Sequence, residues 1–404
     1  MKITVLTQYY KPEMGAPQNR LYEMCDGLHR LGVDVSIITG MPNYPTGKIF
    51  DNYKGKFSMK EEVDGMEVKR YWLYASNAKK ALPRIFNMLS FSFTSLFSLR
   101  YLRKRKNDYL IVESPPLLLG LTGWLLAKFS GAKLVTNISD LWPLSARELG
   151  AISGDGFIYK SLEKVEKFLY KKSSFCMGQS QEIVDYIEDH GAKKVYLFRN
   201  GVDPDRFKGI TRQPKEPNSP FVLTYAGLLG FAQGIAEICK NINFKNLNAE
   251  FHIYGAGGEQ ELIESFIKEN PDNGIFYHGK VSREEIPLVL SRSDSTLIPL
   301  VKNIYGAVPS KIYESMASGL PIMFSGEGEG RNIVLDNDLG WVSDAKDYKA
   351  LEANIKIASE SPELLEQKRK NCIECAQTKY NRPMQIKALY DFLNSNLDNN
   401  EKTI

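Results

Sequence analysis

Short apolar runs alternate along the chain with longer stretches whose apolar residues recur at helical spacing. The first run, residues 3–7, is followed by a loop rich in Pro and Gly at residues 11–17. Residues 21–31 then carry apolar side chains three and four positions apart, and Gly32 ends that period. A second apolar run covers residues 33–39. Strand, loop, helix and strand in such quick succession predict a βαβ unit.

The same alternation continues to residue 198 and restarts at residue 221. Asp64-Gly65, between two runs of strand-forming residues, predicts an antiparallel hairpin. Elsewhere strands and helices alternate, which predicts mostly parallel sheets with helices on both faces. We expect strands at residues 109–113, 133–138, 175–178, 195–198, 221–226, 250–254, 275–278, 295–298, 321–324 and 340–343. We expect helices at residues 116–131, 157–172, 182–190, 235–240, 259–268 and 283–290.

Residues 203–219 interrupt this pattern, because they lack periodicity and are rich in Pro. We interpret them as a linker between two α/β domains, residues 1–202 and 220–380. Residues 346–396 are mostly helical, and Pro383 is expected to break the run. Ligands of open parallel sheets bind beyond the carboxyl ends of the strands, so two such domains facing each other would enclose a cleft.

Composition limits the class of protein further. Lys and Arg number 52 and Asp and Glu 48, and the net charge of +4 is too small to indicate nucleic-acid binding. The apolar share of 43% is that of a globular protein. Five scattered cysteines favour neither a disulfide framework nor a metal site, so we expect no metal, no cofactor and a reducing compartment. Because no apolar run has the length of a membrane span or of a signal peptide, we expect a cytoplasmic protein.

Residues 308–321 carry the pattern most informative about chemistry. Ser310 is placed to begin a helix and Gly319 to end it. Lys311 and Glu314, three positions apart, share one face of the first turn. A phosphate held by the free N–H groups of that turn could meet Lys311, while Glu314 could accept hydrogen bonds from two sugar hydroxyls. The alternative is a solvated ion pair between Lys311 and Glu314 on a surface helix.

The sequence PSKIYESMASGLP resembles the donor-binding motif of retaining glycosyltransferases of family four. The segments QYYKPEMGAPQNRLYEM and ISDLWPLSARELG resemble a bacterial subgroup, the N-acetylfucosamine and GlcNAc-type transferases of O-antigen and capsule assembly. Residues 200–203 also match the family's hinge entry, so the resemblance covers nearly the whole chain. It implies the GT-B fold, in which two Rossmann-like doubly wound domains face each other across a cleft. It further implies that a C-terminal helix, residues 381–404, returns to the N-terminal domain.

The resemblance implies a nucleotide-sugar site in the C-terminal domain. Glu314 is similar to the family's ribose-binding glutamate, but this chain has Gly306 where the family has a second glutamate for the transferred sugar. The family's basic pair after Gly227 is also absent, which leaves Lys311 as the nearest cation for the phosphates. The glycine-rich run at residues 255–258 is typical of a phosphate loop, and equally of a tight turn. The implied substrate-binding residues here are Gly227, Gly255, Gly257, Val281, Gly306, Ala307 and Ser310.

In the N-terminal domain, the resemblance brings the loop of Gly15 and Ala16 close to the donor phosphate; an ordinary turn is the alternative. Arg20 is a candidate contact of phosphate or acceptor, or a plain surface arginine. Asp140, at a strand end, would orient or deprotonate the acceptor hydroxyl; alternatively it caps the following helix. The predicted catalytic residues are Asp140, Lys311 and Glu314.

Residues 82–106 carry an apolar stripe at helical spacing, followed by five cations within seven residues. A core helix with basic residues at its C-terminal end has this pattern. A helix that lies on an anionic membrane surface has it too. The apolar residues are Leu82, Ile85, Phe86, Met88, Leu89, Phe91, Phe93, Leu96, Phe97 and Leu99, and the cations are Arg100, Arg103, Lys104, Arg105 and Lys106.

These observations together predict a retaining glycosyltransferase of bacterial surface polysaccharide synthesis. Its expected partners are a nucleotide sugar, UDP-linked and with an N-acetylated amino or deoxy sugar, a lipid-linked glycan acceptor and an anionic membrane surface, but no nucleic acid. The expected location is peripheral, on the inner face of the plasma membrane. Two alternatives are a nucleotide-sugar epimerase of the same fold and a catalytically silent nucleotide-binding partner, the latter suggested by Gly306.

Overall fold

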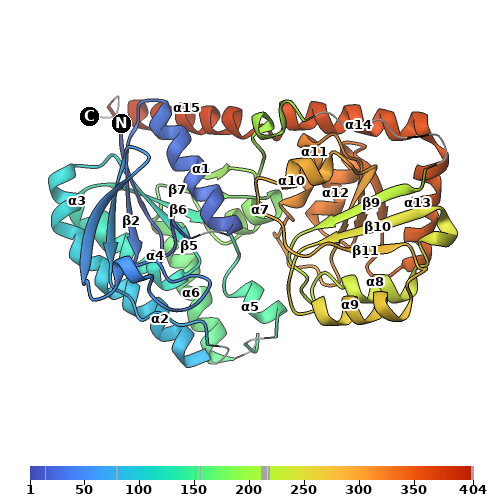
Figure 1. Ribbon diagram of the computed structural model, residues 1–404. Helices are drawn as coiled ribbons and strands as arrows, with labels where there is room; N and C mark the ends of the chain where they lie inside the picture. Colours follow the sequence, from blue (N-terminus) through green and yellow to red (C-terminus); the bar gives the residue numbers. More distant parts are fainter. Residues whose placement is uncertain are drawn as a thin grey trace. The chain divides into compact units, whose positions relative to one another are not determined.

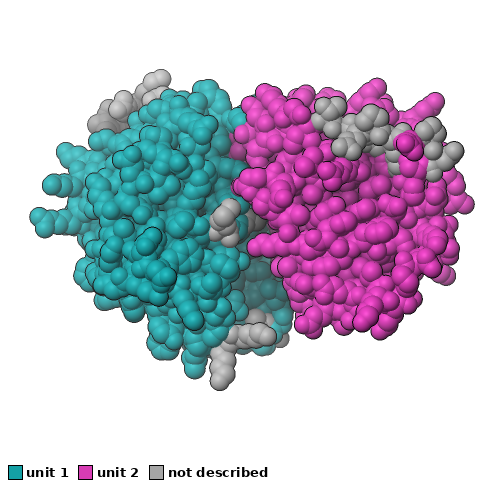
Figure 2. Space-filling view, viewed as in Figure 1, with its two compact units in different colours: residues 1–199, 383–404 teal, residues 200–382 magenta. Residues whose placement is uncertain are grey.

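The computed structural model divides the chain into two compact α/β units (Figures 1 and 2). It describes residues 1–13, 15–78, 81–150, 152–154, 156–210, 216 and 219–401. Unit 1 is formed by residues 1–199 together with 383–404, and unit 2 by residues 200–382. Residues 211–215 and 217–218 of the expected linker lie outside the described part, and its beginning forms a short 3-10 helix, η3 (Pro204–Phe207).

Unit 1 is built on an eight-stranded sheet in the order β3-β4-β2-β1-β5-β6-β7-β8. Its strands are parallel except for β3, which pairs antiparallel with β4 in the predicted hairpin. The fully buried inner strands are near-continuous apolar runs, as expected where helices cover both faces. The strands are β1 (Lys2–Leu6), β2 (Asp34–Gly40), β3 (Ser58–Val63), β4 (Met66–Tyr71), β5 (Tyr109–Ser114), β6 (Lys133–Ile138), β7 (Phe175–Gly178) and β8 (Val195–Leu197).

Helices cover both faces of this sheet (Figure 1). On one face, α1 (Ala16–Arg30) and the last helix, α15 (Arg382–Glu401), share a core with β1, β2 and β5. On the other face, α2 (Ala81–Thr94), η2 (Ser95–Ser98), α3 (Leu99–Arg105) and α4 (Leu117–Ser130) enclose a second core. A smaller core joins α5 (Leu144–Glu148), α6 (Phe157–Lys172) and α7 (Gln181–Asp189) to β6 and β7.

The C-terminal helix α15 is an integral part of unit 1. Its Ile386, Leu389 and Leu393 are buried in the core beside α1, and a Cβ on Gly27 of α1 would lie 2.6 Å from Ile386 Cδ1. Tyr109 Oη donates a hydrogen bond of 2.9 Å to the Leu393 carbonyl. The expected position of the helical break is wrong by a few residues: the chain turns before α15, and Pro383 lies in that helix's first turn, where a missing N–H costs nothing.

Unit 2 is built on a six-stranded, fully parallel sheet in the order β11-β10-β9-β12-β13-β14. Its strands are β9 (Phe221–Ala226), β10 (Ala249–Tyr254), β11 (Ile275–Tyr277), β12 (Ser295–Pro299), β13 (Ile322–Ser325) and β14 (Gly340–Ser343). The helices are α8 (Ile235–Asn241), α9 (Gln260–Glu269), α10 (Ile286–Leu290), α11 (Lys311–Ala317), α12 (Glu329–Asp336), α13 (Tyr348–Glu360) and α14 (Pro362–Gln377), with 3-10 turns η1 (Asp51–Tyr53) in unit 1 and η4 (Lys245–Leu247) here. Two cores, one on each face, hold these layers together.

The predicted fold class, two Rossmann-like α/β domains, is confirmed. The apolar runs located β6, α6, β7, β9 and β14 with the bounds that the structure has. The helix expected at residues 283–290 is shorter, since only Ile286–Leu290 is helical. Just before this helix, the Glu285 carboxylate accepts a hydrogen bond of 2.8 Å from the Ser282 N–H.

Candidate functional site

The loops that follow the carboxyl ends of β9 and β10 are packed backbone against backbone in unit 2. Gly227 N–H donates to the Tyr254 carbonyl at 2.8 Å, and Leu229 N–H to the Ala256 carbonyl at 3.0 Å. Both Gly227 and Gly255 have positive φ, and a Cβ on Gly255 would collide with the Gly227 carbonyl. A Cβ on Gly257 would collide with the Leu229 carbonyl in the same way. This close packing accounts for Gly255 and Gly257 in the 255–258 run, and their substrate-binding roles stay predictions.

Lys311 is the first residue of α11, and its ammonium lies near the carboxyl end of β9. Its Nζ lies 4.8 Å from the centre of the Tyr225 ring, and a Cβ on Gly227 would approach that Nζ to 2.6 Å. Burial lowers the pKa of Lys311, while the nearby Glu314 opposes that shift. Within the described part of the chain, the Lys311 ammonium has no ion-pair partner. The structure therefore holds a desolvated cation over an aromatic ring and beside Gly227, which has no side chain.

Glu314 lies one turn further along α11 and does not pair with Lys311, which corrects the alternative of a solvated pair between the two. Its Oε1 lies 3.8 Å from Nη1 of Arg206, which belongs to η3. The Glu314 side chain is about a quarter exposed, at 28%. Sequence reasoning missed Arg206, because an arginine in a Pro-rich segment gives no local sign of its partner.

A pocket of about 270 Å³ opens beside Lys311. Two of its walls come from the end of β9 and from the segment between β12 and α11. Among the predicted residues it is lined by Ala307, Ser310 and Lys311; the other lining residues are Tyr225, Ala232, Gln233, Ile298, Pro299, Leu300, Lys302, Ile304, Val308 and Pro309. Such a pocket, with mostly apolar lining residues and the two cations Lys302 and Lys311, is typical of a small-molecule site.

Two features of the α11 start differ from expectation. Ser310 occupies the N-cap position, but its side chain makes no capping hydrogen bond. The N–H groups of Ile312 and Tyr313 are already bonded to the carbonyls of Pro309 and Ser310, at 3.2 and 3.1 Å. Fewer N–H groups are therefore available to an anion than the sequence pattern indicated.

Gly306 and Val281 lie outside the lining of this pocket. Gly306 has φ +84° in the turn before α11, a conformation that favours glycine. Val281 is half-buried in the loop after β11. Their substrate-binding roles stay predictions.

Arg20 of α1 is buried, which corrects its reading as a plain surface arginine, while its role as a contact of phosphate or acceptor stays a prediction. Its Nη2 lies 3.1 Å from Glu113 Oε1, and the two side chains are 7% and 9% exposed. Arg20 also donates to Ser139 Oγ and to Gln179 Oε1, and Ser139 donates to Glu113. Asn137 adds a hydrogen bond of 2.5 Å to the other Glu113 oxygen. These residues lie at the carboxyl ends of β5, β6 and β7, so Arg20 links the ends of these three strands.

Asp140 follows this network in the chain and extends to the surface. Its side chain is exposed, and Pro143, not Asp140, occupies the cap position of α5, without a side-chain cap. Partial desolvation by the neighbouring protein raises the pKa of Asp140. The charge of Arg20 lowers this pKa, and the charge of Glu113 raises it. A carboxylate with a raised pKa at a strand end is a candidate proton acceptor.

The loop of Gly15 leads directly into α1. Gly15 is the extended N-cap residue, and a Cβ there would collide with the side-chain oxygen of Gln18. Ala16 is the first residue of α1, and its side chain lies outside the described part of the chain.

Glu13, one turn before α1, is a buried carboxylate that sequence reasoning missed. It is 1% exposed and accepts hydrogen bonds from the N–H groups of Tyr10, Asn43 and Tyr44, at 3.2, 2.7 and 2.8 Å. It thereby ties the loop after β1 to the loop after β2. Burial raises the pKa of Glu13 to about 7, although these hydrogen bonds oppose the shift.

The raised pKa of Glu13 predicts a pH-dependent stability. The unfolded chain releases this proton near pH 4.5 and the folded protein only near pH 7, so the free energy of unfolding falls as the pH rises through that interval. We expect this group to remove about 3 kcal/mol between those limits. Urea unfolding at several pH values checks it: Glu13→Gln should lose stability less steeply over this interval than wild type, with Glu166 still contributing, and the exposed control Glu62→Gln should keep the wild-type slope. Parallel curves for wild type and Glu13→Gln would contradict the assignment.

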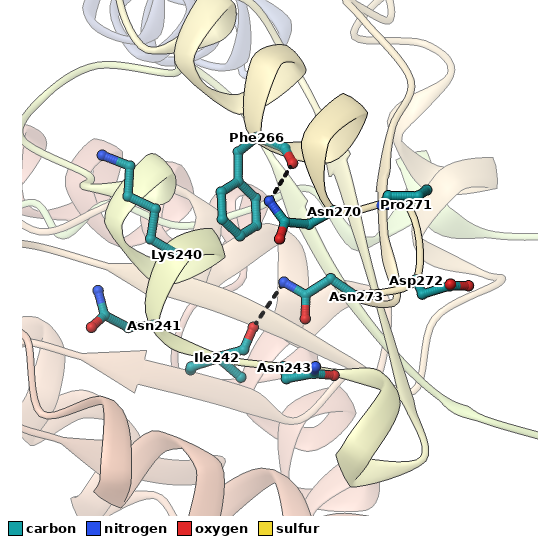
Figure 3. Close-up of a pocket in the computed structure, with 9 residues that line it drawn as sticks. All are labelled: Lys240, Asn241, Ile242, Asn243, Phe266, Asn270, Pro271, Asp272 and Asn273. Atoms are coloured by element: carbon teal, nitrogen blue, oxygen red, sulfur yellow. Dashed lines mark hydrogen bonds between the residues drawn. The ribbon is translucent and has the colours of Figure 1, made fainter.

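A second pocket, of about 400 Å³, lies at the opposite, amino edge of the unit 2 sheet (Figure 3). Its polar side chains largely serve the fold: Asn270 donates to the Phe266 carbonyl, and Asn273 to the Ile242 carbonyl. Over the described ranges, no group of three or more His, Cys, Asp and Glu side chains is arranged to hold a metal ion. Over the same ranges, no helix has both the length and the apolar character needed to cross a bilayer.

Comparison with known protein families divides the chain as the structure does. Residues 15–201 match the family described as Glycosyl transferase 4-like domain. Residues 207–379 match the family described as Glycosyl transferases group 1. The first match falls within unit 1 and its boundary, and the second within unit 2.

Curated relatives and solved structures agree with these matches. The "Putative colanic acid biosynthesis glycosyl transferase WcaI" of Escherichia coli strain K12 is 26% identical over 334 residues, which cover 79% of this chain and 82% of WcaI. The amylovoran biosynthesis glycosyltransferase AmsK of Erwinia amylovora is 26% identical over 170 residues, 40% of this chain and 41% of AmsK. Sucrose-phosphate synthase of Thermosynechococcus elongatus superposes with a TM-score of 0.72 at 16% identity, covering 98% of this chain and 99% of that one. Anabaena HepE in complex with UDP gives 0.71 at 14% identity, covering 98% and 100%.

Proposed function

Because the chain is a GT-B glycosyltransferase, with a glycosyl transferase 4-like domain followed by a group 1 domain, we propose that unit 2 binds a nucleotide sugar through Lys311 and Glu314. The observation that carries this proposal is the ammonium of Lys311, which lies beside Gly227 on the lining of the 270 Å³ pocket and has no ion-pair partner among the residues that the structure describes. A diphosphate would supply the missing anion there. Glu314 would accept hydrogen bonds from the ribose hydroxyls.

The proposed reaction retains the configuration of the sugar. The bond between the anomeric carbon and the β-phosphate oxygen breaks, and a bond from the same carbon to the acceptor oxygen forms on the same face. The departing diphosphate takes up the acceptor proton, and Lys311 stabilises the charge that develops on it. Asp140 of unit 1 is proposed to orient the acceptor hydroxyl. Positioning and charge stabilisation would then supply most of the rate enhancement.

We propose a UDP-linked donor, for which the UDP complexes of HepE, a protein of the same fold, give support. We propose an N-acetylated amino or deoxy sugar, because Gly306 stands where the resemblance implies a glutamate that contacts the transferred sugar. The acceptor is proposed to be a lipid-linked glycan of a bacterial surface polysaccharide, in keeping with the colanic acid and amylovoran names of the relatives. The enzyme would then work at the inner face of the plasma membrane. No observation favours the epimerase alternative.

Calorimetry with UDP tests the role of Lys311. Lys311→Met keeps the apolar stem over Tyr225 and removes the charge, so UDP affinity should fall roughly 10- to 100-fold, the cost of one charge-assisted hydrogen bond. The matched control is Lys240→Met in the same unit, an exposed lysine paired with Glu237, which should bind UDP as wild type does. Equal affinity of the two variants would contradict the site.

A further inference from the structure

Helix α2 exposes a wide apolar face on unit 1. Its opposite face is buried in unit 1, with Asn87 3%, Phe91 0% and Thr94 3% exposed, so the core accounts for only one side of the helix. Leu82, Phe86 and Phe93 are 68%, 60% and 64% exposed, and they lie together on this one helix. We name this exposed surface the α2 face; it comprises Leu82, Ile85, Phe86, Leu89 and Phe93 of α2 together with Phe97 of η2.

Aromatic residues outside α2 extend this face into one continuous surface. Phe57 lies 5.4 Å from Phe97 between ring centres, and Tyr74 lies 6.5 Å from Phe86. Trp72 is next to Phe57, because its N–H donates to the Phe57 carbonyl at 2.8 Å. All five rings are exposed. A contiguous apolar surface of this kind on a soluble domain marks a place where something binds.

The charge around the α2 face favours an anionic occupant. Residues 76–106 contain eight Lys and Arg and neither Asp nor Glu, a net +8 in a chain whose total is +4. Arg100 and Lys104 continue the line of Phe93 and Phe97, at steps of three and four residues, and both are exposed. Arg105, by contrast, is held by Asp34, so the basic cluster expected from the sequence is only partly available.

We propose that the α2 face, with Phe57, Trp72 and Tyr74, docks onto a bilayer that contains anionic lipid. Apolar side chains would enter the boundary between headgroups and acyl chains, and Arg100 and Lys104 would meet the phosphates. Trp and Tyr at the rim are the residues that membrane interfaces favour. A second copy of this chain fits the surface less well, because a symmetric pairing would bring two such basic segments together. This inference rests on the proposed function, in which the enzyme works at a membrane, and it names the surface that would bind that membrane.

Vesicle flotation of the full chain, without donor or acceptor, tests the proposal. Wild type should float with vesicles of phosphatidylcholine and phosphatidylglycerol. The triple variant Leu82→Ser/Phe86→Ser/Phe93→Ser should partition at least about 100-fold more weakly, since three exposed apolar side chains no longer enter the lipid. The matched control, Leu262→Ser/Leu335→Ser/Ile357→Ser, removes three apolar side chains of unit 2 that are 47%, 50% and 44% exposed, and it should bind as wild type does.

A charge variant makes the test independent of any folding defect in the triple variant. Arg100→Gln/Lys104→Gln should weaken binding to the anionic vesicles about five-fold for each charge and leave binding to pure phosphatidylcholine unchanged. Wild type that stays with the soluble fraction, or a triple variant that floats as well as its control, would overturn the proposal. So would a wild-type dimer in light scattering that the triple variant dissociates while neither floats. UDP binding and sugar transfer are measured separately, so a failure of the proposed function is distinguishable from a failure of docking.

Discussion

Glu314→Gln should lower kcat/KM for sugar transfer roughly 10- to 100-fold while the protein stays folded. The carboxylate lies one turn beyond Lys311 and about a quarter exposed, placed to accept two hydrogen bonds from a ribose. A neutral amide presents one acceptor instead of two and lacks the charge, which costs about 1.5–3 kcal/mol for a charged hydrogen bond. UDP affinity by calorimetry should fall in the same proportion, because the ribose is bound before and during transfer.

Arg206→Gln separates this role from the ion pair. Glu314 lies 3.8 Å from Arg206, and replacing either residue removes that pair. If Glu314 binds the nucleotide, Arg206→Gln should keep most of the UDP affinity that Glu314→Gln loses. Equal losses in the two variants would show that the pair, and not the carboxylate as a ligand, is what matters. Wild-type affinity and turnover in folded Glu314→Gln would remove the residue from the site.

Arg20→Met should destabilise unit 1 by about 3–5 kcal/mol, because it leaves the Glu113 carboxylate buried without its cation. Burial already raises the pKa of Glu113, and Arg20 is the charge that opposes this shift. In the Arg20→Met variant, the pKa of Glu113 in the folded state rises further above its pKa in the unfolded state. The deficit should therefore be largest at neutral pH and shrink as the pH falls to the range where Glu113 is protonated in both states.

Denaturant unfolding measured across that pH range checks the deficit and its sign. The double variant Arg20→Met/Glu113→Gln should recover much of the lost stability, since no buried charge remains, although Asn137 and Ser139 keep their hydrogen-bonding groups close by. A double variant no more stable than Arg20→Met, or a deficit that does not change with pH, would contradict the role of the pair.

Local signals in the sequence predicted the elements of the fold well. Buried parallel strands are apolar runs bounded by polar loops, so β6, β7 and β9 could be located from the runs alone. The hairpin of β3 and β4 followed from Asp64-Gly65, whose positive φ values fit a tight turn. Pro383 was misplaced because proline both ends helices and begins them, and only the preceding turn decides between the two.

The candidate site was less predictable, because its geometry joins residues far apart in the chain. Lys311 reaches Gly227 only through the pairing of β9 with β12, which no local pattern specifies. Arg20 and Glu13 look like surface residues in a polar stretch, yet both are buried. Arg20 is held by residues at the ends of β5, β6 and β7, and Glu13 by the loop after β2. The apolar stripe of α2 was visible in the sequence, but which of its two faces is covered depends on α4.

The C-terminal helix constrains how this protein is made. Residues 386, 389 and 393 complete the core of unit 1, whereas the rest of that unit ends at residue 199. The ribosome therefore synthesises all of unit 2 before it synthesises α15, the last helix of unit 1. The apolar surface that α15 covers stays exposed throughout that interval. Domains generally fold in the order of synthesis. Here the part of the chain that is made first is the part that is finished last, so a nascent chain halted between the two units exposes the apolar groove that waits for α15.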